Sequence, residues 1–474
     1  DTLVDMFCYR KHGHNEGDEP SFTQPLMYQA IKKKKSVASI YSQKLIDQEI
    51  VTNKQLEFIK DAVWTDLEKK FEKAKNYKVK SKAWRGGQWS GISIAPKDPL
   101  RRGRTAESAK SLRDIGEKIT KIPKGFNLHP KLVKFNNSRL KAITSGKGID
   151  WSFAEALSFG ALLKEGYKVR LAGQDSGRGT FSQRHSVFYD QKTEERYIPL
   201  NNVFKKQKEF EVIDSFLSEL GVLGFEYGYS LADPNTLVLW EAQFGDFANG
   251  AQIIIDQFIT AGERKWMQMS GLVLLLPHGH EGMGPEHSSA RIERFLQMAA
   301  EDNIQILNCT TPASYFHALR RQIHRNFRKP LILFTPKSTL RHPSNTSSIE
   351  EFTGSSSFHR IIDEELKNPK RIIFCSGKFF YELDDYRKEN KIENVKIVRI
   401  EQLYPFPFDT LGEVILNHKE SELLWVQEEP KNMGAWGFVK SRIRHLFTKN
   451  KLNQKIHYVG RRRAAAPALS LIHI

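Results

Sequence analysis

The sequence predicts an α/β protein made of parallel sheets flanked by helices and divided into two or three domains. Three observations lead to this class. The chain has 474 residues, which is more than one simple core usually holds. Its hydrophobic fraction of 39% and aromatic fraction of 11% are typical of globular folding. From residue 149 onward, short apolar segments alternate with helical ones, and this order predicts parallel strands covered on both faces.

The first 140 residues have a different character. Residues 2–9 have the pattern of a strand and lead into a polar loop. We expect residues 1–30 to be the end of one element followed by this loop. Lys and Glu are then frequent from Lys32 onward, with helical spacing over 42–78, and Gly, Pro and Arg interrupt the pattern over 84–104. We therefore expect residues 31–140 to be a helical linker followed by an extended surface segment.

Residues 141–345 are predicted to form the main domain. A helix over 151–165 ends before Gly166 and is followed by a strand over 167–172. Further strands are expected at 237–240, 272–276, 304–307 and 331–334, with helices at 251–262, 288–300 and 313–328. Ser288 is the expected N-cap of the second of these helices, because its hydroxyl can accept a free backbone N–H.

A smaller α/β domain is expected at residues 355–468, beyond a loop rich in Ser, Thr and Gly at 342–358. Its strands are predicted at 371–375, 395–400 and 423–426. Residues 469–474 are expected to be a non-native tail, since a common transposon-derived sequencing-library end translates to these six residues. No apolar run approaches the ~20 residues of a membrane span, and the three cysteines form no paired framework.

The net charge of +18 is compatible with acidic proteins, anionic substrates, anionic membranes or nucleic acid. Lys and Arg are nevertheless interspersed with 55 acidic residues, and neither zinc-finger spacing nor an RNP motif appears. A basic nucleic-acid-binding protein is therefore a remote alternative, and no nucleic-acid or membrane partner is expected.

Four polar segments stand where an α/β protein carries functional loops, at or beyond strand ends. The segments 10–19, 173–185 and 241–250 contain His14, then Arg178 and His185, then Gln243. For each, a solvated loop or an ordinary strand-to-helix turn is the alternative. The fourth, 278–287, contains His278 and His280. It lacks the HExxH spacing of a helical zinc site, so we predict a polar loop near an anionic ligand and no metal.

Glu155 lies in the first half of the predicted helix at 151–165, with apolar neighbours on most sides. A glutamate in mid-helix is usually solvated. If Glu155 is partly buried instead, its pKa would be raised and it could act as a proton partner.

Together the motifs resemble the 2-oxoglutarate dehydrogenase family of thiamine diphosphate enzymes, from about residue 1 to 468. The matching segments occur in one order: Arg10–Glu16, Asp175–Phe181 with Arg184 and His185, Glu241–Phe247, Glu286–Arg294, Pro336–Ser338, Ser376–Lys378, Glu401–Pro405 and Gln427–Pro430. The resemblance implies the thiamine-diphosphate-binding fold. Residues 1–30 would end the diphosphate-binding domain, 141–345 would be the pyrimidine-binding domain and 355–468 a transketolase-like C-terminal domain. It also implies a homodimer with each cofactor held between two chains.

The resemblance implies specific roles for the candidate residues. Glu155 would be the catalytic glutamate that hydrogen-bonds the aminopyrimidine of thiamine diphosphate. His14, close to the cofactor, and His185 would position the substrate and the lipoyl group and transfer protons. Arg178, Gln243, His278 and His280 would line the cleft. The Mg²⁺ and diphosphate motif of the family has no counterpart here and is expected upstream of Asp1, so the chain is expected to be a C-terminal fragment that is inactive alone.

The implied reaction is the decarboxylation of 2-oxoglutarate and the succinylation of a lipoyl group in the tricarboxylic acid cycle. The implied partners are the lipoyl domain of dihydrolipoamide succinyltransferase and dihydrolipoamide dehydrogenase. The implied compartment is the cytoplasm of a bacterium, or the mitochondrial matrix of a eukaryote. A 2-oxoadipate dehydrogenase of the same family is one alternative. Its substrate is one methylene longer, and a methylene contributes only ~1–3 kcal/mol to the discrimination between two substrates. A catalytically dead scaffold is another.

Overall fold

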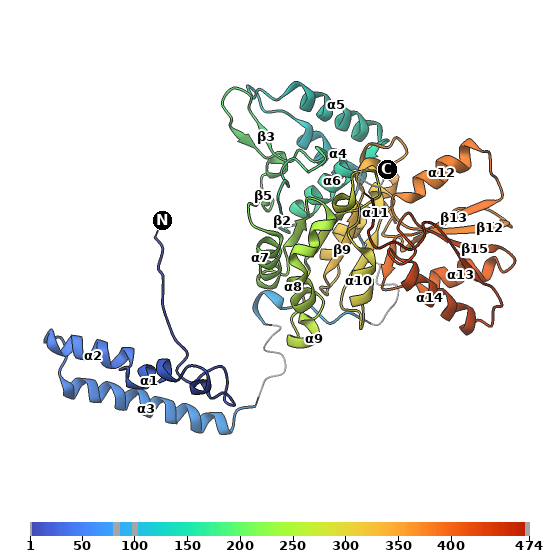
Figure 1. The fold of residues 1–474 in the computed structure, drawn as a ribbon. Helices are drawn as coiled ribbons and strands as arrows, with labels where there is room; N and C mark the ends of the chain where they lie inside the picture. The colour runs from blue at the N-terminus through green and yellow to red at the C-terminus, as the bar shows by residue number, and fades with distance from the viewer. Residues whose placement is uncertain (1, 79–85, 97–102, 470–474) are drawn as a thin grey trace. The chain divides into compact units, whose positions relative to one another are not determined.

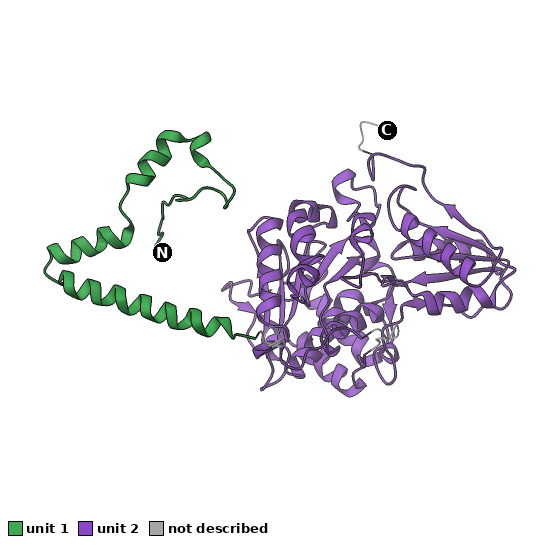
Figure 2. Ribbon diagram, turned by 90° about the horizontal axis from the view of Figure 1, so that it is seen from below, with its two compact units in different colours: residues 1–83 green, residues 84–474 purple. Residues whose placement is uncertain are grey.

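The computed structural model describes residues 2–78, 86–96 and 103–469. The chain forms two compact units, residues 1–83 and 84–474, which Figure 2 distinguishes by colour. Figure 1 labels the helices and strands of both units.

The described part of unit 1 contains three α-helices, α1 (Pro25–Lys33), α2 (Val37–Asp47) and α3 (Asn53–Lys75). Local sequence sets their starts: a proline occupies the first turn of α1, Ser36 caps α2, and Thr52 forms a capping box with Gln55 at α3. The strand predicted at residues 2–9 is wrong. These residues are extended and exposed, and within the described part of unit 1 they pair with no other strand.

Unit 2 is built on a seven-stranded sheet in the order β14-β8-β9-β7-β6-β2-β5, parallel except for β14. The strands are β2 (Val169–Gly173), β5 (Phe210–Asp214), β6 (Leu237–Glu241), β7 (Val273–Pro277), β8 (Gln305–Asn308), β9 (Leu331–Thr335) and β14 (Gln402–Tyr404). The strands predicted here are confirmed within two residues. Strands β5 and β14 were not predicted.

Helices cover both faces of this sheet, as the apolar strands require. One face packs on α4 (Ala109–Thr120), α5 (Pro130–Ser145), α6 (Trp151–Lys164) and α11 (Pro312–His324). The other packs on α7 (Glu219–Ala232), on α10 (Ile292–Met298) and on the π-helical turn Ile255–Ile259. Along β6, Leu239 faces the first core and Trp240 the second, which is the alternation of a doubly covered strand.

Two helical predictions in unit 2 need correction. The helix expected at 251–262 is interrupted, with α8 (Gln252–Ile254), the π-helical turn and α9 (Gly262–Trp266) in succession. Ser288 does not cap α10, which begins at Ile292 after Arg291. The Ser288 hydroxyl instead donates to the carbonyl of Gly284 at 2.6 Å, because the loop before α10 folds back on itself.

A second sheet has the order β11-β13-β12-β15-β16, and the pair β11–β13 is antiparallel. Its strands are β11 (Ile361–Ile362), β12 (Arg371–Cys375), β13 (Val395–Ile400), β15 (Glu422–Val426) and β16 (Ile456–Val459). The helices of this part are α12 (Phe379–Glu389), α13 (Phe408–Asn417) and α14 (Trp436–Lys449). Phe374, Val398 and Trp425 belong to the same buried core as Trp240, so the two sheets share apolar packing.

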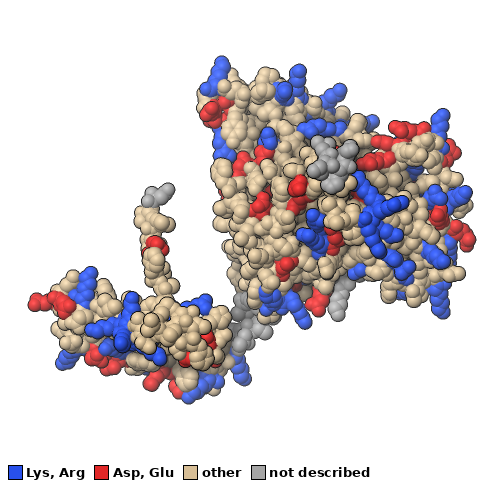
Figure 3. Space-filling view, viewed as in Figure 1, with Lys and Arg blue, Asp and Glu red and all other residues tan. Residues whose placement is uncertain are grey.

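The described part of unit 2 also contains two short antiparallel pairs. Strand β1 (Ile149–Asp150) pairs with β10 (Thr346–Ser347), and β3 (Phe188–Tyr189) pairs with β4 (Arg196–Tyr197). Among the described residues, no helix has the length and apolar character needed to cross a membrane. Lys and Arg side chains gather near the C-terminal end of unit 2 with acidic side chains among them (Figure 3).

Candidate active site

The polar segments after β2 and β6 meet at one edge of the seven-stranded sheet, because the carboxyl ends of neighbouring parallel strands lie together. There they border a cleft of ≈ 1220 Å³. Three of the predicted residues, Arg178, His185 and Gln243, line it. Other cations contribute to the same wall, among them Lys131 and Arg341, while Asp175 and Asp214 supply negative charge. The cleft is therefore polar and suited to a charged ligand.

Glu155 is buried on α6, with only 3% of its surface exposed. The helix begins at Trp151 because the Asp150 carboxylate accepts the N–H of Phe153 at 2.8 Å. Residues on all sides of α6 are apolar, so the helix lies inside the unit and takes its single interior carboxylate with it. A buried charge requires partners nearby.

Arg184 and Tyr315 are those partners. Arg184 Nε donates to Glu155 Oε1 at 2.5 Å and Arg184 Nη2 donates to Oε2 at 3.1 Å. The Tyr315 hydroxyl donates to Oε2 at 2.5 Å. The Tyr315 ring stacks on Trp151 with centroids 4.5 Å apart, which holds the hydroxyl toward Glu155.

The same guanidinium also binds Glu241, the last residue of β6. Arg184 Nη1 and Nη2 donate to the two Glu241 oxygens at 2.6 Å each. Burial raises the pKa of Glu241, and Glu155 raises it further, against the opposing charge of Arg184. Burial would lower the pKa of Arg184, but the two carboxylates outweigh it and raise the pKa well above its usual range. One permanent cation thus serves two buried carboxyl groups, and the trio can hold an extra proton.

Glu155 is separated from the large cleft by one layer of side chains. A small cavity of ≈ 10 Å³ lies beside it, lined by Glu155, Glu241, Phe181 and Tyr315 among others. Ser152, Gln183 and Leu340 line both this cavity and the large cleft. The buried acid therefore lies directly behind the cleft wall.

His185 and Arg178 belong to the loop after β2. The His185 ring is half-buried, and its Nε2 lies 3.1 Å from the carbonyl of Ser182, to which it donates. Burial lowers the pKa of His185, more than its hydrogen bond to Ser182 raises it. The ring is therefore neutral near pH 7, with Nδ1 available as an acceptor. Arg178 is exposed and pairs with Asp175 at the mouth of the cleft.

His278 and His280 follow β7 but do not line this cleft. His278 is buried, with Nε2 2.9 Å from Glu429 Oε1. Burial lowers the pKa of His278, but the hydrogen bond and charge of Glu429 outweigh it and the pKa is raised. Burial lowers the pKa of His280 to about 4. These two histidines form a separate cluster with Glu428 and Glu429.

His14 lies in unit 1, where it is exposed. Its ring Nδ1 accepts a hydrogen bond from Arg10 at 2.8 Å, and its backbone N–H donates to Asp18 at 2.7 Å. The loop 10–19 is thus folded by its own side chains. The candidates that share the large cleft all belong to unit 2.

Arg184, Glu241 and Tyr315 were not predicted as partners of Glu155. Arg184 and Glu241 stand inside two of the matching segments, and a buried carboxylate on an apolar helix is itself a signal that a cation must lie near. Tyr315 lies 160 residues from Glu155 along the chain, on a helix that is buried along nearly its whole length, and carries no local signal.

Three family models match this chain. "Dehydrogenase E1 component" matches residues 1–82, "Transketolase, pyrimidine binding domain" matches 147–343, and "2-oxoglutarate dehydrogenase C-terminal" matches 346–474. Glu155, Arg184, Glu241 and Tyr315 all lie within the second of these ranges.

Curated relatives match almost the whole chain. The 2-oxoglutarate dehydrogenase E1 components of Brucella anthropi and Brucella canis are each 52% identical to it over 99% of its length, and that of Brucella abortus is 51% identical. The alignments cover 49%, 48% and 48% of those relatives, so the chain spans about half their length. With three family models in order and this identity, the chain belongs to the family of 2-oxoglutarate dehydrogenase E1 components.

Proposed function

We propose that the chain supplies the pyrimidine-binding half of a thiamine-diphosphate site in an enzyme that decarboxylates 2-oxoglutarate and succinylates a lipoyl group. The observation that carries the proposal is the buried trio Glu155–Arg184–Glu241 behind the wall of the large cleft. It lies inside the region that matches the pyrimidine-binding family model. When bound, thiamine diphosphate supplies a carbon nucleophile for the 2-oxo group and an electron sink for decarboxylation.

The residues around Glu155 have the hydrogen-bonding groups and the apolar surface that an aminopyrimidine ring requires. A carboxylate offers about four lone-pair positions, and Arg184 and Tyr315 occupy three of them on Glu155. One position remains to hold a proton shared with a ring nitrogen. The Phe181 ring beside the small cavity offers an apolar surface for a flat heterocycle. The cavity itself holds about one water, so the ring would enter from the cleft by displacing its wall.

Glu155 is assigned the role of hydrogen-bonding the ring nitrogen and holding a proton there. Arg184 fixes the orientation of the Glu155 carboxyl group. Glu241, bound to the same guanidinium, can gain or lose a proton when the charge of Glu155 changes. Because the trio is shielded from water, its hydrogen bonds are stronger than they would be in solvent. Replacing any one charged group or hydrogen-bond donor of the trio would therefore change the pKa values of the groups that remain.

His185 is assigned to the substrate side of the cleft. Its neutral ring offers Nδ1 to a proton, and Arg178 nearby can meet a carboxylate. We further propose His14 as a second active-site histidine, Gln243 as a cleft residue, and Mg²⁺ as the ion that holds the diphosphate. The proposed partners are a second copy of the chain in a homodimer, the lipoyl domain of dihydrolipoamide succinyltransferase, and dihydrolipoamide dehydrogenase. The proposed reaction belongs to the tricarboxylic acid cycle.

The test compares wild type and Glu155→Gln in the complete gene product, loaded with thiamine diphosphate and Mg²⁺. We expect release of CO₂ from 2-oxoglutarate to fall by ~10²–10⁴, the usual cost of losing an acid–base group. Glu117→Gln on the exposed face of α4 is the matched control and should leave the rate unchanged. Unchanged turnover in Glu155→Gln would contradict the assignment. Faster turnover of 2-oxoadipate than of 2-oxoglutarate by wild type would overturn the proposed substrate.

A further inference from the structure

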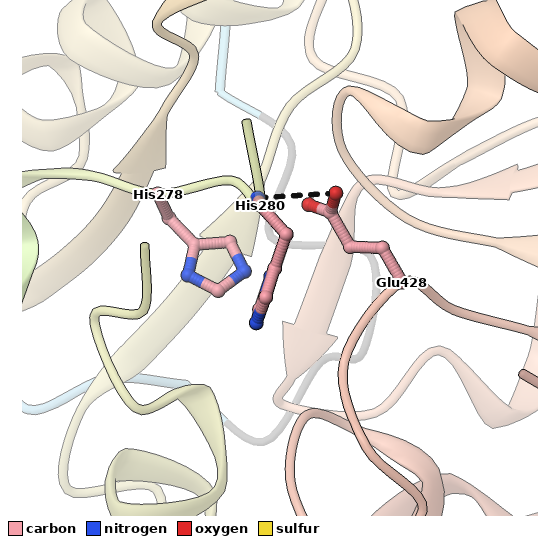
Figure 4. A group of neighbouring side chains, drawn as sticks. All are labelled: His278, His280 and Glu428. Carbon is pink, nitrogen blue, oxygen red and sulfur yellow. Dashed lines mark hydrogen bonds between the residues drawn. The ribbon is translucent and has the colours of Figure 1, made fainter. Parts of the chain in front are cut away.

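A cluster of possible metal ligands lies outside the cleft assigned to the proposed reaction. His278 and His280 come from the loop after β7, and Glu428 comes from the loop after β15 (Figure 4). One ligand atom from each lies within 4.8 Å of the other two. None of the three lines the large cleft. Since 148 residues separate His280 from Glu428, the spacing along the chain gave no sign of the cluster.

The His280 ring is oriented as a metal-binding imidazole is. Its Nε2 lies 3.1 Å from the carbonyl of Pro467, and because a carbonyl only accepts, Nε2 carries the hydrogen. The lone pair is therefore on Nδ1. That atom is buried and makes no hydrogen bond to any residue the structure describes. Metal-binding histidines characteristically donate their other N–H to a carbonyl or carboxylate, which fixes the tautomer.

His278 is held by hydrogen bonds at both ring nitrogens. Its Nδ1 accepts the backbone N–H of Ala290 at 3.1 Å, so the hydrogen is on Nε2, 2.9 Å from Glu429 Oε1. A metal ion can replace that hydrogen. The ion would then be bound by His278 Nε2 with Glu429 as a neighbouring oxygen ligand, and Nδ1 would keep its backbone partner.

Glu428 provides the carboxylate of the set. Its side chain is only 10% exposed, and its Oε2 accepts the backbone N–H of His280 at 3.2 Å, which ties the two loops together (Figure 4). Lys378 Nζ lies 2.9 Å from the same oxygen and competes with a metal for it. Lys378 is also 2.7 Å from Glu382, so it keeps a partner when Glu428 turns to an ion.

We propose that His278, His280 and Glu428, with Glu429 beside them, form a binding site for a divalent metal ion of the zinc class. Two imidazole nitrogens with carboxylate oxygens are typical zinc ligands, whereas Ca²⁺ and Mg²⁺ prefer all-oxygen sites. Small movements of the side chains would bring the ligand atoms to the usual bond lengths of about 2.0–2.2 Å. The ion would join the loop after β7, a strand of the first sheet, to the loop after β15, a strand of the second.

The experiment uses the purified 474-residue chain, dialysed against a chelator and titrated with Zn²⁺ in competition with a zinc-binding dye. The variants are His280→Ala, which removes Nδ1, and Glu428→Gln, which keeps the size of the side chain. His457→Ala is the matched control, because His457 is an exposed histidine on β16 that is not among the clustered ligands. Far-UV circular dichroism establishes that each variant is folded.

We expect wild type and His457→Ala to bind one Zn²⁺ per chain, and both cluster variants to bind at least ~10-fold more weakly. Zn²⁺ should raise the melting temperature of wild type but not that of the cluster variants. Cobalt should give the visible absorption of a four-coordinate site in wild type and in His457→Ala, but not in the two cluster variants. Weak binding to folded wild type, or equal binding by all four proteins, would mean that the cluster is only a network of hydrogen bonds and ion pairs.

The metal site is independent of the proposed decarboxylation. Its ligands are not assigned to the reaction, and its tests need neither thiamine diphosphate nor substrate. Loss of turnover in Glu155→Gln with unchanged zinc binding would support both proposals separately.

Discussion

At the scale of single residues, Arg184 has the largest expected effect on stability. Its side chain is 5% exposed and holds the carboxylates of Glu155 and Glu241, which are themselves almost fully buried. Without Arg184 these groups would be buried charges with no cation, or would have to take up protons. Removing one partner of a buried ion pair typically costs ~3–5 kcal/mol.

We therefore expect Arg184→Met to lower the free energy of unfolding by about 3–5 kcal/mol at pH 7. Urea unfolding followed by circular dichroism measures it. Arg178→Met is the control, because Arg178 pairs with Asp175 at the exposed mouth of the cleft, and a change within about 0.5 kcal/mol is expected. Adding Glu155→Gln and Glu241→Gln to Arg184→Met should restore part of the loss. If Arg184→Met is as stable as wild type, the buried trio does not hold the core as described.

The residue types of the site were predictable, but their partners were not. The apolar residues around Glu155 on α6 left both a solvated and a buried side chain open, whereas the grouping of Arg178 with Gln243 follows from strand ends at one edge of a sheet. The link from Glu155 to Tyr315 depends on how α6 packs against α11, and that contact leaves no trace in local sequence. The cluster of His278 with Glu428 likewise depends on the relation between two sheets.

At the scale of elements, Glu401 joins the end of β13 to the start of β14. These strands belong to different sheets, and Glu401 is fully buried between them. Its carboxylate accepts the Thr310 backbone N–H at 2.8 Å and the Thr310 hydroxyl at 2.5 Å. Burial raises the pKa of Glu401 above its usual 4.5, although Arg399 and these hydrogen bonds lower it.

This shift predicts a pH dependence of stability. A carboxyl group whose pKa is raised by folding stabilises the native state below its unfolded pKa of 4.5, and the contribution is lost as the pH rises through the folded pKa. Gln at position 401 does not titrate. We expect the unfolding midpoint of Glu401→Gln to rise relative to wild type as the pH increases from about 4.5, measured by urea titration at several pH values. A constant difference between the two proteins would contradict a raised pKa.

Gly173 has no side chain, and this allows the end of β2 to lie close to the end of β6. A Cβ atom there would lie 2.3 Å from the Glu241 carbonyl oxygen and 2.7 Å from Ser176 Oγ. We expect Gly173→Ala to lower the free energy of unfolding by about 1–3 kcal/mol, because backbone must move. Gly228→Ala within α7 meets nothing within 4 Å and should stabilise by about 0.5–1 kcal/mol. Thermal melts of both variants measure the contrast, and equal melting temperatures would contradict it.

Most long elements of unit 2 were predictable because one signal dominates each of them. The continuous apolar residues of β6, β7 and β9 are explained by helices on both faces of the sheet. Strand β5 was missed because it is an edge strand with alternating burial and polar neighbours. The strand predicted at 2–9 failed because apolar residues alone do not make a strand without a partner to receive its hydrogen bonds.

At the scale of the whole molecule, the two units differ in how much they bury. In unit 2 the sheets and helices enclose two large apolar cores. In the described part of unit 1, only Tyr28 and Ile31 are buried hydrophobic residues, while Phe58, Trp64 and Phe71 on α3 are 74%, 68% and 66% exposed. Helix α3 is held mainly by its capping box and by exposed ion pairs such as Lys60–Glu57. Such local interactions contribute only tenths of a kcal/mol each.

We therefore expect residues 84–474 alone to melt cooperatively within a few degrees of the whole chain, and residues 1–83 alone to lose helicity gradually on heating. A helix with few buried contacts is marginal in water, so no sharp transition should come from unit 1. Differential scanning calorimetry of the two pieces and of the whole chain tests this. A separate cooperative peak from residues 1–83 would show that unit 1 has its own core. A markedly lower melting temperature for residues 84–474 than for the whole chain would also contradict the prediction.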